Sequence, residues 1–409
     1  MKKIKYVHWI IMIIVLAVQD MTFCQANAAN GISTDFVKQI NTNIIVQYYV
    51  DAVSGNDKYD GRSSRSPWKT IDKINGVKMQ PGSAVNFKRE QVFRGVITAQ
   101  SGVTYRSYGS GDKPMILGSH EVNASSAWIQ EANNIWTYQN AILGLDVGNI
   151  IFNQGEATGI RVFQEGDLDK DLEFFYNKQN TKIKIFSQTN PAQRFRDVEL
   201  ALAKGIFILF NVQDVIVQDL ALFNTAANAV SINGCNRILI ENLDVAYIGG
   251  ANLYSLINQP GVIRYGNGIE IYKNGQDILI RNNKINQVYD SALTNQSFLD
   301  EATQNNIIYQ ENIVTNSEWC FELWIYAGNS YMKNVLFEKN ICSASGLGWG
   351  HNQRPDGPNG NNIVVLKNPA TTENVFIQNN VFYKATEANM RFSDPNDQRF
   401  FTIVNNVVF

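Results

Sequence analysis

The sequence predicts an all-β chain that folds as a single-stranded right-handed parallel β-helix, with an N-terminal capping region and a small β insertion. From residue 206 a short strand motif recurs as VIVQDLAL, ILIENLDV, ILIRNNKI, IIYQENIV, VLFEKNIC, VFIQNNVF and FTIVNNVV. Its sixth position is occupied in turn by Leu220, Leu243, Asn283, Asn312, Asn340, Asn380 and Asn406. Asparagines at one corner of successive coils can hydrogen-bond along the stack and tolerate a left-handed bend. A β-sandwich has hairpin turns and needs no such column, so the pattern favours a solenoid.

The N-terminus has the pattern of a cleavable signal peptide, which we place at residues 1–28. The basic start MKKIK precedes an apolar run at 9–18, and ANA at 26–28 offers small residues for cleavage. This apolar run is too short to anchor the chain across a bilayer. We therefore expect a secreted or periplasmic protein with no membrane span in the mature chain.

The remaining chain divides into three predicted parts. Residues 29–46 are expected to form a linker, and residues 206–409 the regular β-helix. Between them, residues 47–205 are expected to hold the N-terminal cap, the first coils and the β insertion, with a short helix around Ile71–Ile74. The last coil, FTIVNNVVF, has no visible polar cap. We expect a partner, self-association or the N-terminal segment to cover it, or the chain to be a shortened one.

Composition limits the chemistry. The formal net charge is −2 and no basic run is present, so nucleic acid is not an expected partner. Beyond the predicted signal peptide only two histidines remain, which argues against a His-rich zinc site or a Ser-His-Asp triad. The remaining cysteines, Cys235, Cys320 and Cys342, are expected to be buried free thiols, with a Cys320–Cys342 bridge as the alternative.

Four features together resemble the pectate-lyase-like superfamily of right-handed parallel β-helices, of the carbohydrate-active, bacterial secreted type. They are the opening segment YYVDAVSGND…DG…SPWKTI, the strands FKREQVFRG and SGVTYRSYGSGDKP, and the coils containing NN. The resemblance covers residues 47–409. It implies the fold but not one reaction, because the superfamily includes polysaccharide lyases, glycoside hydrolases, uronate epimerases and non-catalytic adhesins.

Three acids are the candidate catalytic residues. Strand alternation places Glu270 and Glu322 on the outer face of coils two apart, and Asp290 at a corner of the coil between them. Like charges on neighbouring coils repel, so this cluster favours a functional site over an ordinary solvated face. The same alternation places Leu347 and Trp349 of SGLGWG inward in the following coil.

Polar and aromatic residues beside the acids are the candidate substrate contacts. The loop GWGHNQRPDGPNG provides His351, Arg354 and Asp356, while Trp319 and Tyr326 provide aromatic edges for sugars. Arg354 could hold a substrate carboxylate, or be paired with Asp356.

Three functions fit these residues, and hydrolysis of a polysaccharide or oligosaccharide is favoured. In a hydrolase, Asp290 and Glu322 divide the acid and the nucleophile or base roles. In a lyase or uronate epimerase, Glu270, Asp290 and Glu322 hold Ca²⁺ while Arg354, Lys273 or His351 removes a proton. The third function is a non-catalytic glycan-binding or surface protein.

Overall fold

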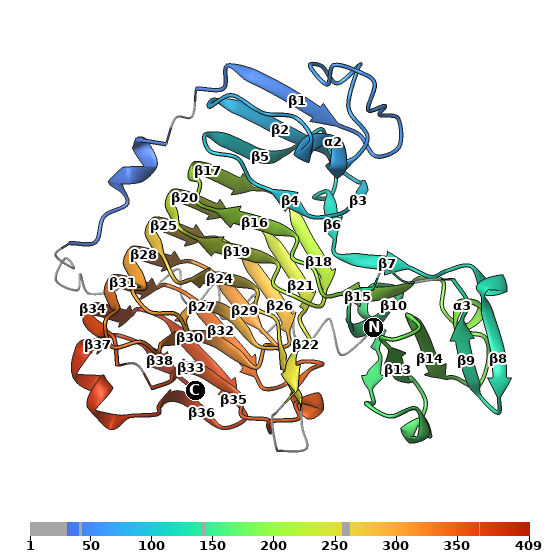
Figure 1. Ribbon diagram of the computed structural model, residues 1–409. Coiled ribbons are helices and arrows are strands. Elements are labelled where there is room, and N and C mark those ends of the chain that lie inside the picture. The colour runs from blue at the N-terminus through green and yellow to red at the C-terminus, as the bar shows by residue number, and fades with distance from the viewer. Residues whose placement is uncertain (1–30, 41–42, 141, 143, 256–261, 368) are drawn as a thin grey trace.

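The computed structural model describes residues 31–409 except 41–42, 141, 143, 256–261 and 368. In this part the chain winds into a stack of β-coils, with a smaller β insertion projecting from one side (Figure 1). The predicted signal peptide, residues 1–28, lies outside the described residues. No helix in the described ranges is long and apolar enough to cross a membrane.

Three long sheets form the faces of the β-helix, and each coil adds a parallel strand to them. The ten-stranded sheet contains, in spatial order, β1 (Val46–Val50), β2 (Ser83–Lys88), β5 (Val103–Tyr108), β17 (Gln213–Gln218), β20 (Cys235–Glu241), β25 (Gly275–Arg281), β28 (Thr303–Gln310), β31 (Tyr331–Glu338), β34 (Thr371–Gln378) and β37 (Phe401–Val404). The eight-stranded sheet contains β36 (Ala388–Phe392), β33 (Asn361–Val365), β30 (Trp319–Ile325), β27 (Ser291–Ser297), β24 (Ile269–Tyr272), β19 (Val230–Asn233), β16 (Phe207–Phe210) and β4 (Ile97–Thr98).

The thirteen-stranded sheet includes both coil strands and strands that lead into the insertion. Its members are β11 (Ala157–Thr158), β10 (Val147–Phe152), β15 (Val198–Leu202), β18 (Ala221–Thr225), β21 (Asp244–Ile248), β26 (Lys284–Val288), β29 (Ile313–Thr315), β32 (Ile341–Ser345), β35 (Val381–Ala385) and β38 (Val407–Val408), with β3 (Val92–Arg94), β6 (Met115–Leu117) and β7 (Ser119–Glu121) beside them. The helices are α2 (Ile71–Asn75), α3 (Pro191–Arg194) and the 3-10 turns η1 (Asp35–Lys38), η2 (Ser125–Ala127), η3 (Asn153–Gly155), η4 (Glu165–Asp167), η5 (His351–Gln353) and η6 (Pro395–Phe400).

The insertion is a five-stranded sheet with its own core. It contains β12 (Ile160–Arg161), β13 (Glu173–Asn177), β14 (Lys182–Phe186), β9 (Ile135–Tyr138) and β8 (Trp128–Ala132). Its buried residues form a cluster separate from the core of the β-helix, which extends from Tyr48 to Phe382. A hairpin of β22 (Ala251–Ser255) and β23 (Val262–Tyr265) forms a further small sheet.

The predicted asparagine column is present as a hydrogen-bonded ladder. The side-chain amide of Asn312 donates to the side-chain oxygen of Asn340 at 3.0 Å and to the backbone oxygen of Ile280 at 2.9 Å. Asn283, Asn340 and Asn380 repeat this pattern. The left-handed residue is the one before each ladder asparagine, as at Asn282 with φ of 56°. Thus the fifth motif position makes the bend, and the sixth satisfies the buried backbone groups beside it.

Residues 31–40, expected to belong to a linker, instead lie against the ten-stranded sheet. Phe36 and Ile40 are buried on an outward-facing apolar row formed by Ile216, Leu239, Leu279, Ile308 and Leu336. The segment therefore covers the side of the solenoid (Figure 1). Of the described residues, those of the N-terminal segment do not cover the last coil, where Val408 and Phe409 are 52% and 69% exposed.

Two of the three cysteines differ from the first expectation. Cys320 on β30 and Cys342 on β32 form a disulfide between successive coils, whereas Cys235 is a buried free thiol. The alternative pairing is therefore the correct one. Cys235, Cys320 and Cys342 all lie inside the core of the β-helix.

Candidate active site

The three candidate acids lie where strand alternation predicts them. β24, β27 and β30 are neighbours in the eight-stranded sheet, and Glu270, Thr294 and Glu322 share one register row. Ile269 and Ile271 are fully buried on the other face. Since parallel strands are about 4.8 Å apart, the two glutamates begin about 10 Å apart on the outer face, with one coil between them.

Glu322 is an outward residue that is nevertheless buried, with 4% of its surface exposed. The hydroxyls of Ser291 and Thr294, both on the adjacent strand β27, donate to its Oε2 at 2.9 and 2.8 Å. Burial and then the charge of Asp290 raise the pKa of Glu322 to about 8. No described cation contacts this carboxyl group, so it is a proton carrier near neutral pH.

Asp290 immediately precedes β27 and has a different environment. The Arg354 guanidinium donates to Asp290 Oδ1 at 3.1 Å. Burial raises the pKa of Asp290, while the positive charge of Arg354 opposes that shift. Because Asp290 contacts a cation and Glu322 contacts hydroxyls, the negative charge of the pair resides on Asp290 and the proton on Glu322.

Glu270 is held by three side-chain amides. Asn228, Asn267 and Gln296 donate to its carboxyl oxygens at 2.8, 2.9 and 2.6 Å. Burial raises the pKa of Glu270, and the amide donors oppose that shift because they stabilise the carboxylate. Glu270 is therefore a fixed acceptor at the edge of the acid pair.

The loop after β32 differs from the strand expected at 345–350. Leu347 is 44% exposed, and Trp349 lies outside the core, where its indole N–H donates to the backbone oxygen of Gln287 at 3.1 Å. The next strand of the eight-stranded sheet is β33, whose Ile363 and Val365 point inward. The prediction of inward Leu347 and Trp349 was wrong because glycine-rich turns disrupt the period of two on which it relied.

This loop brings Arg354 to the acids. Besides Asp290, the guanidinium contacts the Tyr289 backbone oxygen at 3.1 Å and Asp356 Oδ2 at 3.2 Å. It also lies over the rings of Tyr289 and Trp319, at 5.2 and 5.3 Å from their centroids. The pairing of Arg354 with Asp356 expected as one alternative is thus present, together with a pairing to Asp290.

Trp319 and His351 support the loop. Trp319 is 7% exposed, and its indole N–H donates to the backbone oxygen of Asn359 at 2.9 Å. It is therefore a buried support beneath Arg354, and the prediction that it forms an exposed sugar-stacking edge was wrong. His351 Nδ1 lies 2.9 Å from Glu318 Oε2. The other carboxyl oxygen of Glu318, Oε1, accepts from the Asn359 backbone N–H at 2.6 Å.

The insertion also contacts this loop. Gln353 Oε1 accepts from the backbone N–H of Arg161 at 3.0 Å, and its amide donates to Gly159 at 3.0 Å. The buried Arg264 donates to the backbone oxygens of Gln353 and Gly148 at 2.9 and 2.8 Å. The insertion and the β22–β23 hairpin thereby help to fix the position of Arg354.

Tyr326 lies with two other aromatic residues at the ends of β27 and β30. We call Phe298, Trp324 and Tyr326 the aromatic cluster; Phe298 and Tyr326 are exposed and Trp324 is half-buried. Phe298 and Tyr326 stack with centroids 5.3 Å apart and an interplanar angle of 6°, and Trp324 lies 5.8 Å from Phe298. Trp324 is on the same outer face as Glu322, two residues along the strand. Such rings can stack on the apolar faces of sugars.

The sequence reasoning missed the neutral partners of the acids and two of the three aromatic residues. Trp324 could have been found, since it repeats the outward period of Glu322. Ser291 and Thr294 gave no comparable signal, because hydroxyl residues are frequent in exposed strands.

The contacts bear on the expected calcium site. Within the described ranges, no group of three or more His, Cys, Asp or Glu side chains is arranged to hold a metal ion. Instead, Glu270 accepts hydrogen bonds from amides, Asp290 from a guanidinium and Glu322 from hydroxyls. Calcium dependence therefore stays a prediction for experiment.

Comparison with solved structures identifies the fold. The complex of XylC with xylose matches with a TM-score of 0.52 and 13% identity, over 85% of this chain and 68% of that one. The chain has the pectin-lyase-like parallel β-helix fold.

Two further pectin-lyase-like structures match more weakly. The GH136 lacto-N-biosidase from Eubacterium ramulus has a TM-score of 0.38 and 13% identity, over 88% of this chain and 67% of that one. The alginate lyase from Paenibacillus sp. str. FPU-7 has a TM-score of 0.39 and 10% identity, over 83% of this chain and 93% of that one. No protein-family model and no curated protein matches the sequence.

Proposed function

We propose that this chain is a secreted glycoside hydrolase that cleaves a polysaccharide or oligosaccharide with Glu322 as general acid and Asp290 as its ionised partner. The observation that carries this proposal is the asymmetry of two neighbouring carboxyl groups. Asp290 contacts Arg354, whereas Glu322 contacts the hydroxyls of Ser291 and Thr294. Glycoside hydrolysis requires such a pair, one carboxyl protonated and the other charged.

In the proposed reaction, Glu322 transfers its proton to the glycosidic oxygen as the bond from that oxygen to the sugar carbon breaks. Asp290 supplies the negative charge opposite, either by attacking the sugar carbon or by removing a proton from an attacking water. Arg354 holds the Asp290 carboxylate in place through a fixed guanidinium. Water completes the reaction, so the products are two sugars, one with a new reducing end.

The aromatic cluster supports a carbohydrate substrate and suggests its direction. The Arg354 loop lies at the start of β27 and β30, the acids follow, and Phe298, Trp324 and Tyr326 lie at the strand ends. A sugar chain that contacts both the loop and the aromatic cluster would run along these strands, across the acid pair.

Elimination by a lyase or uronate epimerase is supported less well. Arg354, one of its candidate bases, would have to lose a proton, yet the charges of Asp290 and Asp356 raise the pKa of Arg354. His351 is hydrogen-bonded to Glu318 through Nδ1, and Lys273 lies just past the end of β24. The available contacts thus favour proton donation by Glu322 over proton removal by these bases.

The test is an activity panel of neutral and uronate polysaccharides with the intact chain. Hydrolysis releases reducing ends without ultraviolet absorbance and persists in EDTA, whereas elimination creates an absorbing double bond. Glu322→Gln should reduce hydrolysis by about 10²- to 10⁴-fold, and Glu373→Gln at an exposed position of β34 should leave it unchanged. An absorbing product that disappears with EDTA would establish the lyase. Binding without any cleavage would establish a glycan-binding protein.

A further inference from the structure

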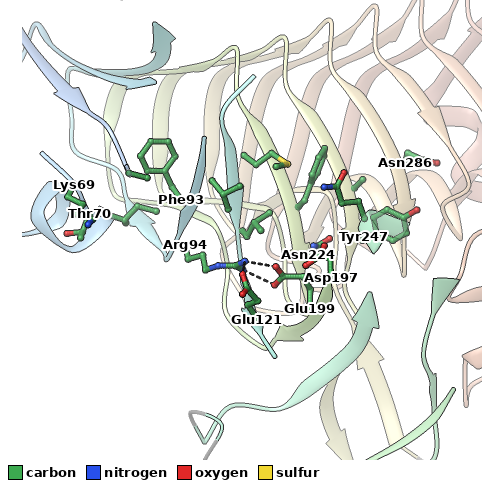
Figure 2. Close-up of a pocket in the computed structure, with 18 residues that line it drawn as sticks. Lys69, Thr70, Phe93, Arg94, Glu121, Asp197, Glu199, Asn224, Tyr247 and Asn286 are labelled. Carbon is green, nitrogen blue, oxygen red and sulfur yellow. Dashed lines mark hydrogen bonds and ion pairs between the residues drawn. The ribbon is translucent and has the colours of Figure 1, made fainter. Parts of the chain in front are cut away.

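A second cleft lies on the thirteen-stranded sheet, away from the three acids. It has a volume of about 810 Å³ and is bounded by the outer face of this sheet, by β7 and β15, where the insertion joins the β-helix, and by Lys69 and Thr70 before α2. Figure 2 shows the side chains that line it, with Arg94 facing Glu199. Glu270, Asp290 and Glu322 are not among its lining residues, so it is a separate site.

The floor of the cleft is one register row that crosses five coils. Its residues, in spatial order, are Arg94, Leu117, Phe223, Ala246 and Asn286. With about 4.8 Å between parallel strands, the row is about 19 Å long. The three central residues are apolar and the two ends are polar. The cleft is therefore elongated along the β-helix axis, with an apolar strip between hydrogen-bonding ends.

One buried polar side chain in the cleft lacks a partner. Asn224 is 7% exposed and lines the cleft, and its side-chain amide makes no hydrogen bond with any described residue. The amide atoms of Asn224 are not enclosed by the protein, so they are open to a ligand in the cleft. An amide of this kind both donates and accepts, which suits a hydroxyl-bearing ligand.

The charges in the cleft disfavour an anionic ligand. Glu199 and Glu121 bind the Arg94 guanidinium at 2.8 and 3.2 Å. Asp197 adds a third carboxylate, and Lys69 is the one other cation among the lining residues. Carboxylates thus outnumber cations, and Arg94 is already neutralised.

We propose that this cleft is a second carbohydrate-binding site, which takes a neutral oligosaccharide along the Arg94–Asn286 row. Sugar rings would lie on the strip of Leu117, Phe223 and Ala246, and their hydroxyls would bond to Asn224 and the carboxylates. The volume lies within the range of known ligand pockets, about 300–1,000 Å³. The inference does not depend on the proposed hydrolysis, since it involves none of the acids of that site.

The test measures binding to the full chain carrying Glu322→Gln, so that bound sugars are not hydrolysed. Neutral hexasaccharides of β-linked xylose, glucose and mannose are titrated by calorimetry, with hexagalacturonate as the anionic comparison. Ala246→Trp fills the floor of the cleft. The matched control is Ser343→Trp, which lies in the same register row on β32 but beyond the cleft.

We expect Ala246→Trp to weaken binding of a neutral hexasaccharide at this site at least tenfold, and Ser343→Trp to leave it unchanged. Asn224→Asp adds no bulk and is tolerated in the left-handed conformation of residue 224, so it repeats the comparison if Ala246→Trp does not fold. Equal binding by Ala246→Trp and Ser343→Trp would overturn the proposal. So would hexagalacturonate binding in the cleft as tightly as the neutral sugars. Cleft binding together with a wild-type chain that hydrolyses none of the panel would refute the proposed hydrolysis but not this site.

Discussion

Glu322 and Asp290 show how the surroundings of a carboxyl group decide its charge. On the outer face of the β-helix Glu322 is buried and Asp290 is partly buried, yet Asp290 contacts a guanidinium and Glu322 contacts two hydroxyls. Hydroxyls stabilise a carboxylate less than a fixed cation does, so at Glu322 the rise in pKa caused by burial exceeds the lowering caused by the two hydroxyls. The consequence is a buried proton whose loss is coupled to both reaction and stability.

The pH dependence of stability tests this assignment. The pKa of Glu322 rises from 4.5 to about 8 in the folded chain, so between these values the native state holds a proton that the unfolded chain releases. Its contribution to stability is therefore lost as pH rises from 4.5 to 8. Glu322→Gln stays neutral, so its stability relative to wild type should rise by about 1.4 kcal/mol per pH unit in this window.

Denaturant unfolding at pH 5, 6, 7 and 8 measures that difference, with Glu373→Gln as the exposed control. A constant difference across the four pH values would show that Glu322 is ionised in the native state. In the wild type, hydrolysis should fall as pH rises above about 8, since the general acid is then deprotonated.

The aromatic cluster permits a second test at the level of single residues. Tyr326→Ala and Trp324→Ala remove a stacking surface worth about 1 kcal/mol, so each should raise KM roughly fivefold with little change in kcat. Phe210→Ala is the control, because Phe210 is an exposed aromatic residue on the same sheet but several coils away. An equal effect of all three substitutions on KM would show that the aromatic cluster does not contact the substrate.

At the scale of elements, the asparagine ladder is a repeated solution to one problem. Each bend leaves backbone groups that the strands cannot pair, and one amide satisfies groups on both neighbouring coils. Leu220 and Leu243 occupy the same position earlier in the chain. Leucine has no side-chain amide, so it cannot extend the ladder. The backbone N–H of Leu243 donates to Asn283 Oδ1, the first ladder residue, at 2.9 Å.

The loss of stability on substituting a ladder asparagine should therefore depend on its position in the stack. Asn312→Ala removes the side-chain partners of the backbone N–H of Asn283 and the backbone oxygen of Ile280, and should lower the free energy of unfolding by at least about 2 kcal/mol. Asn406→Ala should cost less, because Asn406 is only partly buried and water can replace its amide. Urea unfolding of both variants measures this order, and a larger loss at Asn406 would contradict it.

At the scale of the whole molecule, the solenoid presents an apolar row on its ten-stranded sheet that an isolated stack would expose. Phe36 and Ile40 cover this row, which runs from Ile216 to Leu336. The segment 31–40 is held by these side chains and by two hydrogen bonds between Ser33 and Asn306. These described residues have no strand pairing to the coils, so they form a unit that can open without unfolding them.

Phe36→Ala should release this segment. Removing the buried ring should lower the free energy of opening of this segment by about 3 kcal/mol. Hydrogen exchange at residues 32–40 should then be roughly 100-fold faster, while exchange in β25 and β28 is unchanged. Sedimentation at high concentration then shows whether the uncovered row promotes self-association, as already expected for the last coil. Unchanged exchange at 32–40 would mean that other contacts hold the segment.

The sequence by itself determined the β-helix, the corner column and the outward direction of Glu270 and Glu322. These follow from periodicity, because neighbouring coils impose the same local rule on each repeat. The tertiary structure alone decided which carboxyl group meets Arg354, which is covered by Ser291 and Thr294, and where the glycine-rich loop places Trp349. It also decided the pairing of Cys320 with Cys342. These are contacts between residues far apart along the chain or in aperiodic turns, where no repeat in the sequence specifies the direction of a side chain.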